Sequence, residues 1–261
     1  MARRDIQGSR AIVTGASSGI GHAVALELSR NGADVVILAR REDRLTELAR
    51  QIVEAGGRVE TVAGDITEPD VRQHAIDAAV SQFGGLDILI NNAGIGAMGL
   101  FEEADRARLR RVMEVNFFSL VEMTRAALPH LKQGKRPIVV NVSSILGHRG
   151  TPHSSEYSAS KFAVQGFSEA IRAEFTKPGI DVLVVSPGTT ATEFFDSVIE
   201  ETSTPSWPEH APVTADEVAR QMVIAIRRGR HEIIPYRWGK VLCWLNRLSP
   251  TMVDRLMSRY V

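Results

Sequence analysis

The sequence predicts an α/β fold: a three-layer, doubly wound parallel sheet of about seven strands with a C-terminal amphipathic helical extension. Short apolar runs rich in β-branched residues alternate with longer segments of helical periodicity, as expected of a parallel sheet covered on both faces. A glycine-rich turn joins the first apolar run to the first helical segment. With 261 residues and 44% hydrophobic content, the chain is long enough for one well-buried domain.

We expect this single domain to span residues 1–235. Its predicted strands are residues 11–14, 35–38, 59–62, 88–90, 138–142, 182–185 and 233–234. Long helices are expected at about 104–131 and 156–176, and Thr214 with Glu217 has the spacing of a capping box that begins a further helix.

The glycine turn after the first strand reads Gly15-Ala-Ser-Ser-Gly19-Ile-Gly21. Gly15 permits a tight turn, and Gly19 and Gly21 let the backbone approach a pyrophosphate at the helix N-terminus, where free N–H groups favour negative charge. The spacing differs from the commoner G-x-G-x-x-G, so it predicts a phosphate-binding turn without naming the branch of the fold. A glycine-rich surface turn that binds nothing is the alternative interpretation.

Two arginines, Arg40 and Arg41, follow the second strand. Enzymes that bind NAD usually place an acidic residue there for the ribose 2′-hydroxyl, whereas an arginine suits a 2′-phosphate. We therefore infer NADP(H) as the cofactor. The alternative is that both arginines are solvated charges at the start of the next helix.

A candidate proton-transfer site comes from Tyr157, Lys161 and Ser144, which lies thirteen residues before the tyrosine. Residues four apart share a helix face, so the Lys161 ammonium is expected to lie near the Tyr157 phenol and lower its pKa. Ser144 is then placed to hold a substrate oxygen. Tyr-x-x-x-Lys alone is weak support, because an ordinary helix face gives the same spacing; the cofactor turn in the same chain strengthens it.

These motifs occur in a characteristic order: Thr14 to Gly21, Asn91-Asn-Ala-Gly94, Asn116, Ser144, Tyr157-x-x-x-Lys161 and Pro187-Gly188. With them the chain resembles the short-chain dehydrogenase/reductase family, single-domain branch, over about residues 8 to 235. The resemblance implies a Rossmann-type domain in which Tyr157 is the general acid in carbonyl reduction and Lys161 lowers its pKa and binds the nicotinamide ribose. It also implies that Ser144 orients the carbonyl and that Asn116 holds a water linking Lys161 to solvent. No metal is required.

The same resemblance assigns the cofactor contacts. Asp65 is expected to accept a hydrogen bond from adenine, with Ile66 beside the ring, although a plain turn aspartate is the alternative. Asn91 and Gly94 are expected to line the cofactor, since they follow a strand end. The residues predicted to bind the cofactor are Gly15, Ser17, Ser18, Gly19, Ile20, Gly21, Arg40, Arg41, Asp65, Ile66, Asn92, Ala93, Gly94, Tyr157, Lys161, Pro187, Gly188, Thr190 and Thr192.

Residues 189–213 are expected to form a substrate lid. Phe194, Phe195, Ile199 and Trp207 suggest a mainly apolar substrate, although the same side chains could simply dock the lid onto the domain.

Residues 236–261 form a tail with its own apolar pattern, which predicts two short amphipathic helices. Trp238, Trp244 and an excess of basic residues allow peripheral membrane contact; packing on the lid or on a partner subunit is the simpler interpretation. The basic residues are Arg237, Lys240, Arg247, Arg255 and Arg259, against Asp254 alone.

Charge and composition narrow the function classes. Lys plus Arg equals Asp plus Glu at 31 each, so nucleic-acid binding has little support. The single cysteine excludes an internal disulfide, and the N-terminus lacks the apolar core of a secretory signal, so we expect a cytoplasmic protein. From the resemblance we expect a homodimer or homotetramer acting on a small-molecule carbonyl or alcohol.

Three classes of function remain: an NADPH-dependent carbonyl reductase, an alcohol dehydrogenase working in the opposite direction or with NAD, and a cofactor-binding regulatory or scaffolding protein. The complete set of Asn116, Ser144, Tyr157 and Lys161 argues against the third class, because binding alone needs no proton donor.

Overall fold

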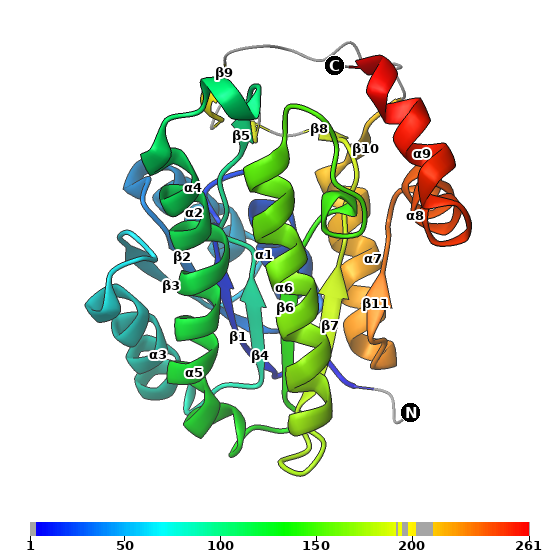
Figure 1. Cartoon of the computed structure of the whole chain (residues 1–261). Helices are drawn as coiled ribbons and strands as arrows, with labels where there is room; N and C mark the ends of the chain where they lie inside the picture. The colour runs from blue at the N-terminus through cyan, green and yellow to red at the C-terminus, as the bar shows by residue number, and fades with distance from the viewer. Residues whose placement is uncertain (1–3, 192, 195–197, 202–210, 261) are drawn as a thin grey trace.

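A computed structural model describes residues 4–191, 193–194, 198–201 and 211–260. Its centre is one parallel sheet with strand order β11-β7-β6-β4-β1-β2-β3 (Figure 1). The strands are β1 (Arg10–Thr14), β2 (Asp34–Ala39), β3 (Val59–Ala63), β4 (Ile88–Asn91), β6 (Ile138–Val142), β7 (Asp181–Val185) and β11 (Glu232–Ile233). The predicted seven-stranded parallel sheet is confirmed.

Strand order reverses beside β1, which pairs with β2 on one side and with β4 on the other. The connections leave the central strands in opposite directions, and this separation opens a crevice at their carboxyl ends. The glycine turn after β1 and the Asn91-to-Gly94 segment after β4 both lie at that edge.

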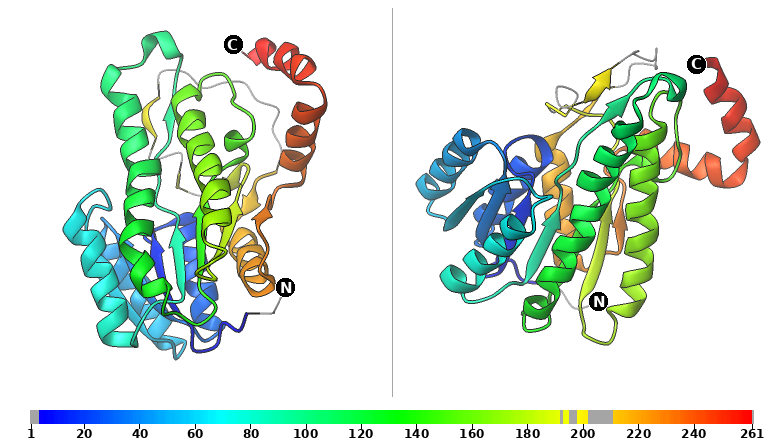
Figure 2. Two further views of the ribbon diagram at one scale, coloured as in Figure 1. Left: turned by 60° about the horizontal axis from the view of Figure 1, so that its bottom comes forward. Right: turned by 60° about the vertical axis from the view of Figure 1, so that its left-hand side comes forward.

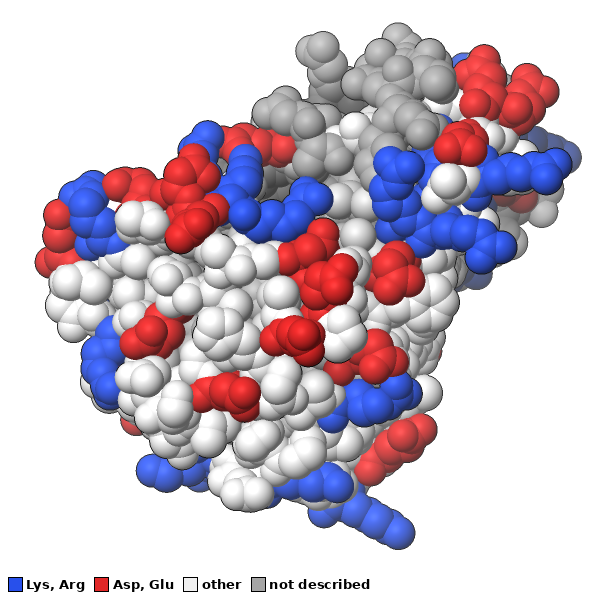
Figure 3. Space-filling view, turned by 90° about the vertical axis from the view of Figure 1, so that its left-hand side faces the viewer, with Lys and Arg blue, Asp and Glu red and all other residues white. Residues whose placement is uncertain are grey.

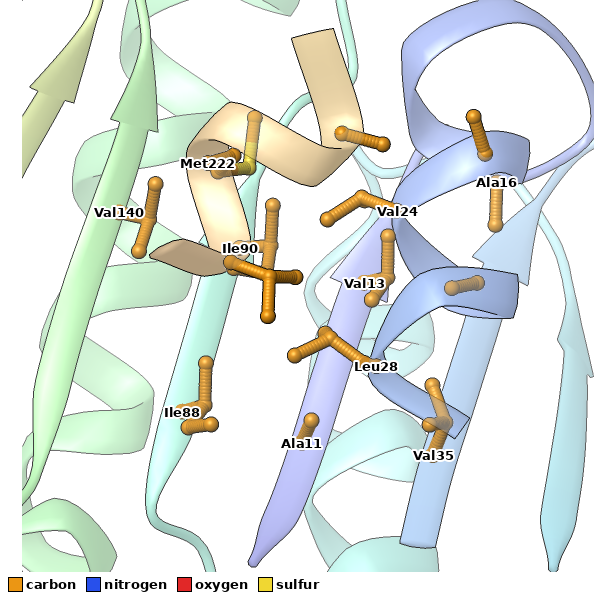
Figure 4. Packing of buried hydrophobic residues seen from close by; sticks show 14 of the residues in the cluster. Ala11, Val13, Ala16, Val24, Leu28, Val35, Ile88, Ile90, Val140 and Met222 are labelled. Atoms are coloured by element: carbon orange, nitrogen blue, oxygen red, sulfur yellow. The ribbon is translucent and has the colours of Figure 1, made fainter. Parts of the chain in front are cut away.

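Helices cover both faces of the sheet. One face carries α1 (Gly19–Arg30), α2 (Glu42–Glu54) and α7 (Ala215–Arg228), and the other carries α3 (Pro69–Phe83), α4 (Arg106–Met113), α5 (Ser119–Leu131) and α6 (Ser155–Glu174). Because successive strand residues point to opposite faces, Ala11 and Val13 of β1 pack with α1 and α7, whereas Ile12 packs on the other side. Figure 4 shows Val24 and Leu28 of α1 and Met222 of α7 meeting over these strands.

The helix expected at 104–131 has a different form. It begins at Arg106, because Asp105 is its N-cap and accepts a hydrogen bond from the backbone N–H of Ala107 at 3.2 Å. A π-helical turn, Glu114–Phe118, separates α4 from α5. Such turns widen a helix locally, and this one contains Asn116.

Small elements lie above the carboxyl edge of the sheet. β5 (Ala97–Met98) pairs with β9 (Ile199–Glu201), and β8 (Thr190–Ala191) pairs with β10 (Val213–Thr214). Short 3-10 turns are Phe101–Glu103, Ile145–Gly147 and Ser258–Tyr260. One of the two hydrogen bonds of the predicted capping box is present: the Thr214 side chain accepts from the N–H of Glu217.

The tail forms two helices, α8 (Arg237–Leu248) and α9 (Pro250–Met257), as predicted. The views of Figures 1 and 2 place them opposite α2 and α3. Arg149, in the loop before α6, holds both helices through Asn246 Oδ1 at 3.1 Å and Asp254 Oδ1 at 2.6 Å. Across the described ranges, no helix combines the length and apolarity needed to cross a membrane.

Candidate active site

A cavity of about 2150 Å³ opens at the carboxyl edge of the sheet. It brings together most of the predicted site residues: Gly15, Ser17, Ser18, Gly19, Ile20, Arg40, Arg41, Asp65, Ile66, Asn92, Ala93, Gly94, Ser144, Tyr157, Lys161, Pro187, Gly188 and Thr190. Gly21 and Asn116 are not among the lining residues, and Thr192 lies outside the described residues, as do Phe195 and Trp207 of the expected lid.

The glycine turn is shaped by a close backbone approach. Gly15 has φ +67°, and a β-carbon there would stand 2.8 Å from the Cα of Ala93. A β-carbon on Gly21 would stand 2.2 Å from the carbonyl oxygen of Gly15 and 2.4 Å from Asn92 Nδ2. Gly21 is therefore required by the folding of the turn onto α1, whereas we expected it to admit the pyrophosphate.

Thr14 and Asn92 tie this turn to the end of β4. The Thr14 hydroxyl accepts from the backbone N–H groups of Asn92 and Ala93, both at 3.0 Å. Asn92 Nδ2 in turn donates to the carbonyl oxygens of Thr14 and Gly15 at 3.0 and 3.1 Å. These bonds fix the two loops that border the cavity on either side of the strand reversal.

Asn91, which we expected to line the cofactor, lies elsewhere. Its Nδ2 donates to Thr124 Oγ1 and Asn141 Oδ1, both at 2.9 Å, and the residue is buried. Asn91 is still part of β4 and stands opposite Asn141 of β6, so its side chain follows the strand alternation into the interior. The expectation for Asn91 was wrong, whereas Gly94 lines the cavity.

A cluster of positive charge marks the end of β2. Arg41 Nη2 donates to Ser18 Oγ at 2.6 Å, and its Nε donates to Ser17 Oγ at 3.2 Å. Arg44, one helical turn further on, also lines the cavity and was missed, although its i+3 spacing from Arg41 was a usable signal. Figure 3 shows Lys and Arg side chains beside a hollow on this face of the molecule.

Arg41 and Arg44 both contact a carboxylate from a distant segment of the chain. Glu193 Oε2 lies 3.1 Å from Arg41 Nη1, and its Oε1 lies 3.6 Å from Arg44 Nη2. Glu193 belongs to the predicted lid, and no pattern in the sequence pairs it with α2.

Asp65 lines the cavity in the conformation of a turn residue. Its Oδ1 accepts from the backbone N–H and the hydroxyl of Thr67, both at 2.9 Å. Ile66 beside it is buried and also lines the cavity. The contacts of Asp65 are therefore those of a turn aspartate, which was the alternative interpretation. Its hydrogen bond to adenine stays a prediction.

Ser144, Tyr157 and Lys161 meet at the deep end of the cavity. Lys161 Nζ donates to the carbonyl oxygen of Val142 at 3.0 Å and lies 5.7 Å from the centre of the Tyr157 ring. Burial raises the pKa of Tyr157 to about 12, although a hydrogen bond with Ser144 acts in the opposite direction. Burial also lowers the pKa of Lys161 to about 8. The expected lowering of the Tyr157 pKa is therefore absent from this arrangement, in which desolvation dominates.

Asn116 lies behind this group in the π-helical turn. Its Nδ2 donates to the Ile95 carbonyl and to Ser160 Oγ, both at 3.0 Å, and its Oδ1 accepts from the Ile95 N–H at 2.8 Å. A β-carbon on Gly94 would be 3.2 Å from Asn116 Oδ1 and 3.6 Å from Lys161 Nζ. Because Gly94 has no side chain, the space between Asn116 and Lys161 is not filled by a β-carbon. The water predicted to link Lys161 to solvent through Asn116 stays a prediction.

The part of the cavity beside this group is apolar, and residues of the tail form part of its wall. The Phe194 ring lies 5.6 Å from the Tyr157 ring, measured between centres. The other apolar side chains are Ile145, Leu146, Val198, Trp238, Val241, Leu242, Leu245, Leu256 and Met257. The tail was expected to pack on the lid or on a partner subunit, and its periodicity did not indicate which of its residues line the cavity.

Metal ligands are not grouped anywhere in the described ranges: no set of three His, Cys, Asp or Glu side chains is placed to hold an ion.

Comparisons with known proteins indicate the family of the chain. A family model described as short chain dehydrogenase matches residues 9–203. An 11-beta-hydroxysteroid dehydrogenase A from Sesamum indicum is 34% identical over 96% of this chain and 74% of its own length. A 3-ketodihydrosphingosine reductase from Bacteroides thetaiotaomicron is 34% identical over 89% of this chain and 81% of its own length.

Solved structures share the fold. A short chain dehydrogenase from Burkholderia cenocepacia in complex with NADP has a TM-score of 0.79 at 29% identity, covering 88% of this chain and 97% of that one. A short chain dehydrogenase/reductase from Burkholderia phymatum in complex with NAD has a TM-score of 0.87 at 24% identity, covering 95% and 96%, and supports the fold alone.

Proposed function

Because the chain belongs to the short-chain dehydrogenase/reductase family, we propose that it transfers hydride between NADP(H) and a carbonyl or secondary alcohol of an apolar substrate. The observation that carries the proposal is the meeting of Ser144, Tyr157 and Lys161 in the same cavity as the glycine turn. A protein that only binds nucleotide needs the turn but not this group.

The residues at the nucleotide end fit a dinucleotide with a 2′-phosphate. Gly15 lets the turn pack closely against Ala93, and Ser18 lies just before the N-terminus of α1, where N–H groups favour a pyrophosphate. Arg40, Arg41 and Arg44 are suited to a 2′-phosphate. The Burkholderia cenocepacia neighbour, solved with NADP, supports this choice, whereas the Burkholderia phymatum neighbour was solved with NAD.

In the reductive direction the bound cofactor supplies a hydride to the carbonyl carbon. Tyr157 donates a proton to the carbonyl oxygen, and its pKa of about 12 keeps the phenol protonated at neutral pH. Ser144 holds the same oxygen by hydrogen bonding as negative charge develops on it. Lys161, beside the tyrosine, stabilises the phenolate that remains until the proton is replaced.

The apolar end of the cavity favours a large hydrophobic substrate. Ligand pockets for drug-sized molecules are about 300 to 1,000 Å³, so a cavity of about 2150 Å³ has room for a dinucleotide and a second molecule. The names of the relatives, a hydroxysteroid dehydrogenase and a ketodihydrosphingosine reductase, point to large apolar substrates as well.

The remaining proposals concern partners and location. We propose a homodimer or homotetramer that pairs the outer faces near α5 and α6, where Phe118 and Phe162 are exposed. Contact of the tail with an anionic membrane surface is supported by exposed Trp238 and Trp244 among basic residues. The cytoplasm is the proposed compartment, where NADPH favours reduction.

The decisive experiment follows oxidation of NADPH, and separately of NADH, with steroid ketones and long-chain ketones as substrates. We expect turnover that prefers NADPH, and a fall of at least about 100-fold in kcat for Tyr157→Phe with nucleotide affinity retained. Nucleotide binding without any turnover would favour a regulatory role, and a preference for NADH would overturn the choice of cofactor.

A further inference from the structure

We propose that Glu193 weakens the preference of this chain for NADP(H) by competing with the adenosine 2′-phosphate for Arg41 and Arg44. The inference rests on the proposed binding of NADP(H) and adds a residue that opposes it. It starts from the observation that a carboxylate of the same chain is bound where the phosphate is expected.

The geometry of the contact resembles anion recognition. The two oxygens of Glu193 bridge two guanidinium groups, one on Arg41 and one on Arg44. A phosphate placed between two arginines would do the same with two of its oxygens.

Arg41 has little capacity left for a second anion while Glu193 is bound. Its Nε and Nη2 donate to Ser17 and Ser18, and its Nη1 contacts Glu193. A guanidinium has five N–H groups in a fixed plane, and Arg41 already makes four hydrogen bonds to Ser17, Ser18 and Glu193. A 2′-phosphate that binds two N–H groups of Arg41 must therefore displace Glu193 or a serine hydroxyl.

The strength of the ion pair determines how far this competition goes. The side chains of Glu193, Arg41 and Arg44 are 41%, 44% and 52% exposed, so solvent weakens their attraction. A phosphate ester carries more negative charge than a carboxylate and displaces it, at some loss of affinity. NAD(H) has no 2′-phosphate and can bind with the ion pair intact, so Glu193 narrows the difference between the two cofactors.

Fragments of the cofactor isolate this contact from catalysis. Calorimetry would measure the affinity of 2′,5′-ADP, which carries the 2′-phosphate, and of 5′-AMP, which does not. For Glu193→Gln we expect 2′,5′-ADP to bind about three- to tenfold more tightly, with the 5′-AMP affinity changed by less than about twofold.

Glu42→Gln is the matched control. Glu42 is an exposed residue directly after Arg41, so its replacement removes the same charge near the site. Its backbone carbonyl accepts from the Thr46 hydroxyl at 3.0 Å. If Glu42→Gln tightened 2′,5′-ADP as much as Glu193→Gln does, a general field would explain the result and the inference would fail.

Arg41→Met distinguishes the role of Glu193 from the proposed binding of NADP(H). We expect this change to weaken 2′,5′-ADP at least about tenfold and to reduce the effect of Glu193→Gln in the double variant. Weakening by Arg41→Met together with no effect of Glu193→Gln would overturn the role of Glu193 and leave the NADP(H) proposal standing. Equal affinities of the unaltered protein for 2′,5′-ADP and 5′-AMP would instead overturn the choice of NADP(H).

Discussion

The two ends of the cavity are built from different kinds of contact. At the nucleotide end, backbone segments approach within 3 Å of where a Gly15 side chain would lie, and Thr14 and Asn92 join two loops by hydrogen bonds. At the substrate end, apolar side chains from the lid and the tail line the cavity. The first end depends on individual atoms, whereas the second depends on apolar area.

This difference predicts unequal tolerance to substitution. At the nucleotide end, we expect a substitution to be tolerated only where the replaced atoms make no hydrogen bond or close contact. At the substrate end, we expect a substitution to be tolerated if the volume and polarity of the side chain are kept. Four measurements, taken from the largest expected effect to the smallest, test this contrast.

Gly21→Ala is expected to have the largest effect, because its β-carbon would overlap the Gly15 carbonyl and the Asn92 amide. We expect the free energy of unfolding to fall by about 2–4 kcal/mol and nucleotide to bind at least about tenfold more weakly, measured by denaturation and calorimetry. Gly166→Ala is the control: that exposed residue of α6 has open space, and alanine should stabilise the helix by about 0.5–1 kcal/mol. Equal losses in both variants would contradict the contrast.

The buried pair at the deep end should be visible in the pH dependence of stability. The pKa of Lys161 falls from 10.5 to about 8, so between those values the unfolded chain holds more protons and the free energy of unfolding rises with pH. The pKa of Tyr157 rises from 10 to about 12 on folding. Between pH 10 and 12 the folded chain therefore holds more protons, and the contribution of Tyr157 to the free energy of unfolding falls as the pH rises. We expect a gain of up to about 2 kcal/mol between pH 8 and 10 in urea denaturation.

Lys161→Met removes the rising part of this profile. A variant whose free energy of unfolding still rose by the same amount between pH 8 and 10 would show that Lys161 is not the group responsible.

Leu242→Ala tests the apolar wall. This half-buried side chain of α8 lines the cavity, so its truncation should raise KM for a long apolar ketone about five- to tenfold. The kcat/KM of a short aldehyde that does not reach the tail should stay within about twofold. If both substrates lost activity equally, Leu242 would act through the fold rather than through the wall.

Trp244→Ser should have the smallest effect on the isolated enzyme. Its side chain is 66% exposed on α8, and we expect the free energy of unfolding to change by less than about 0.5 kcal/mol with KM unchanged. Sedimentation with anionic vesicles is the measurement in which a loss is expected, provided that the tail contacts membrane. Retention of vesicle binding by this variant would argue against that contact.

Sequence reasoning grouped residues of particular chemical types, and the structure brings them together. Gly15 and the Ser144, Tyr157 and Lys161 group line one cavity, while their roles stay predictions. The seven-stranded sheet followed from the spacing of apolar runs, since each strand must be covered on both faces.

The failures have separate physical causes. Asn91 was misplaced because a strand extended by one residue turns its last side chain inward. The pKa of Tyr157 was misjudged because burial cannot be seen in a sequence. Glu193 and the wall formed by α8 are contacts between segments far apart in the chain, with no local pattern to announce them.

One glycine serves both ends of the cavity. A β-carbon on Gly188, in the Pro-Gly motif, would lie 2.2 Å from the ring of Tyr236, which is the residue before α8. The Tyr236 ring thus occupies the space that a side chain at position 188 would need. We expect the two positions to vary together among relatives: a protein that gains a side chain at the first should have lost the aromatic ring at the second. The residue type at the start of the tail is thus limited by the loop that contains Gly188.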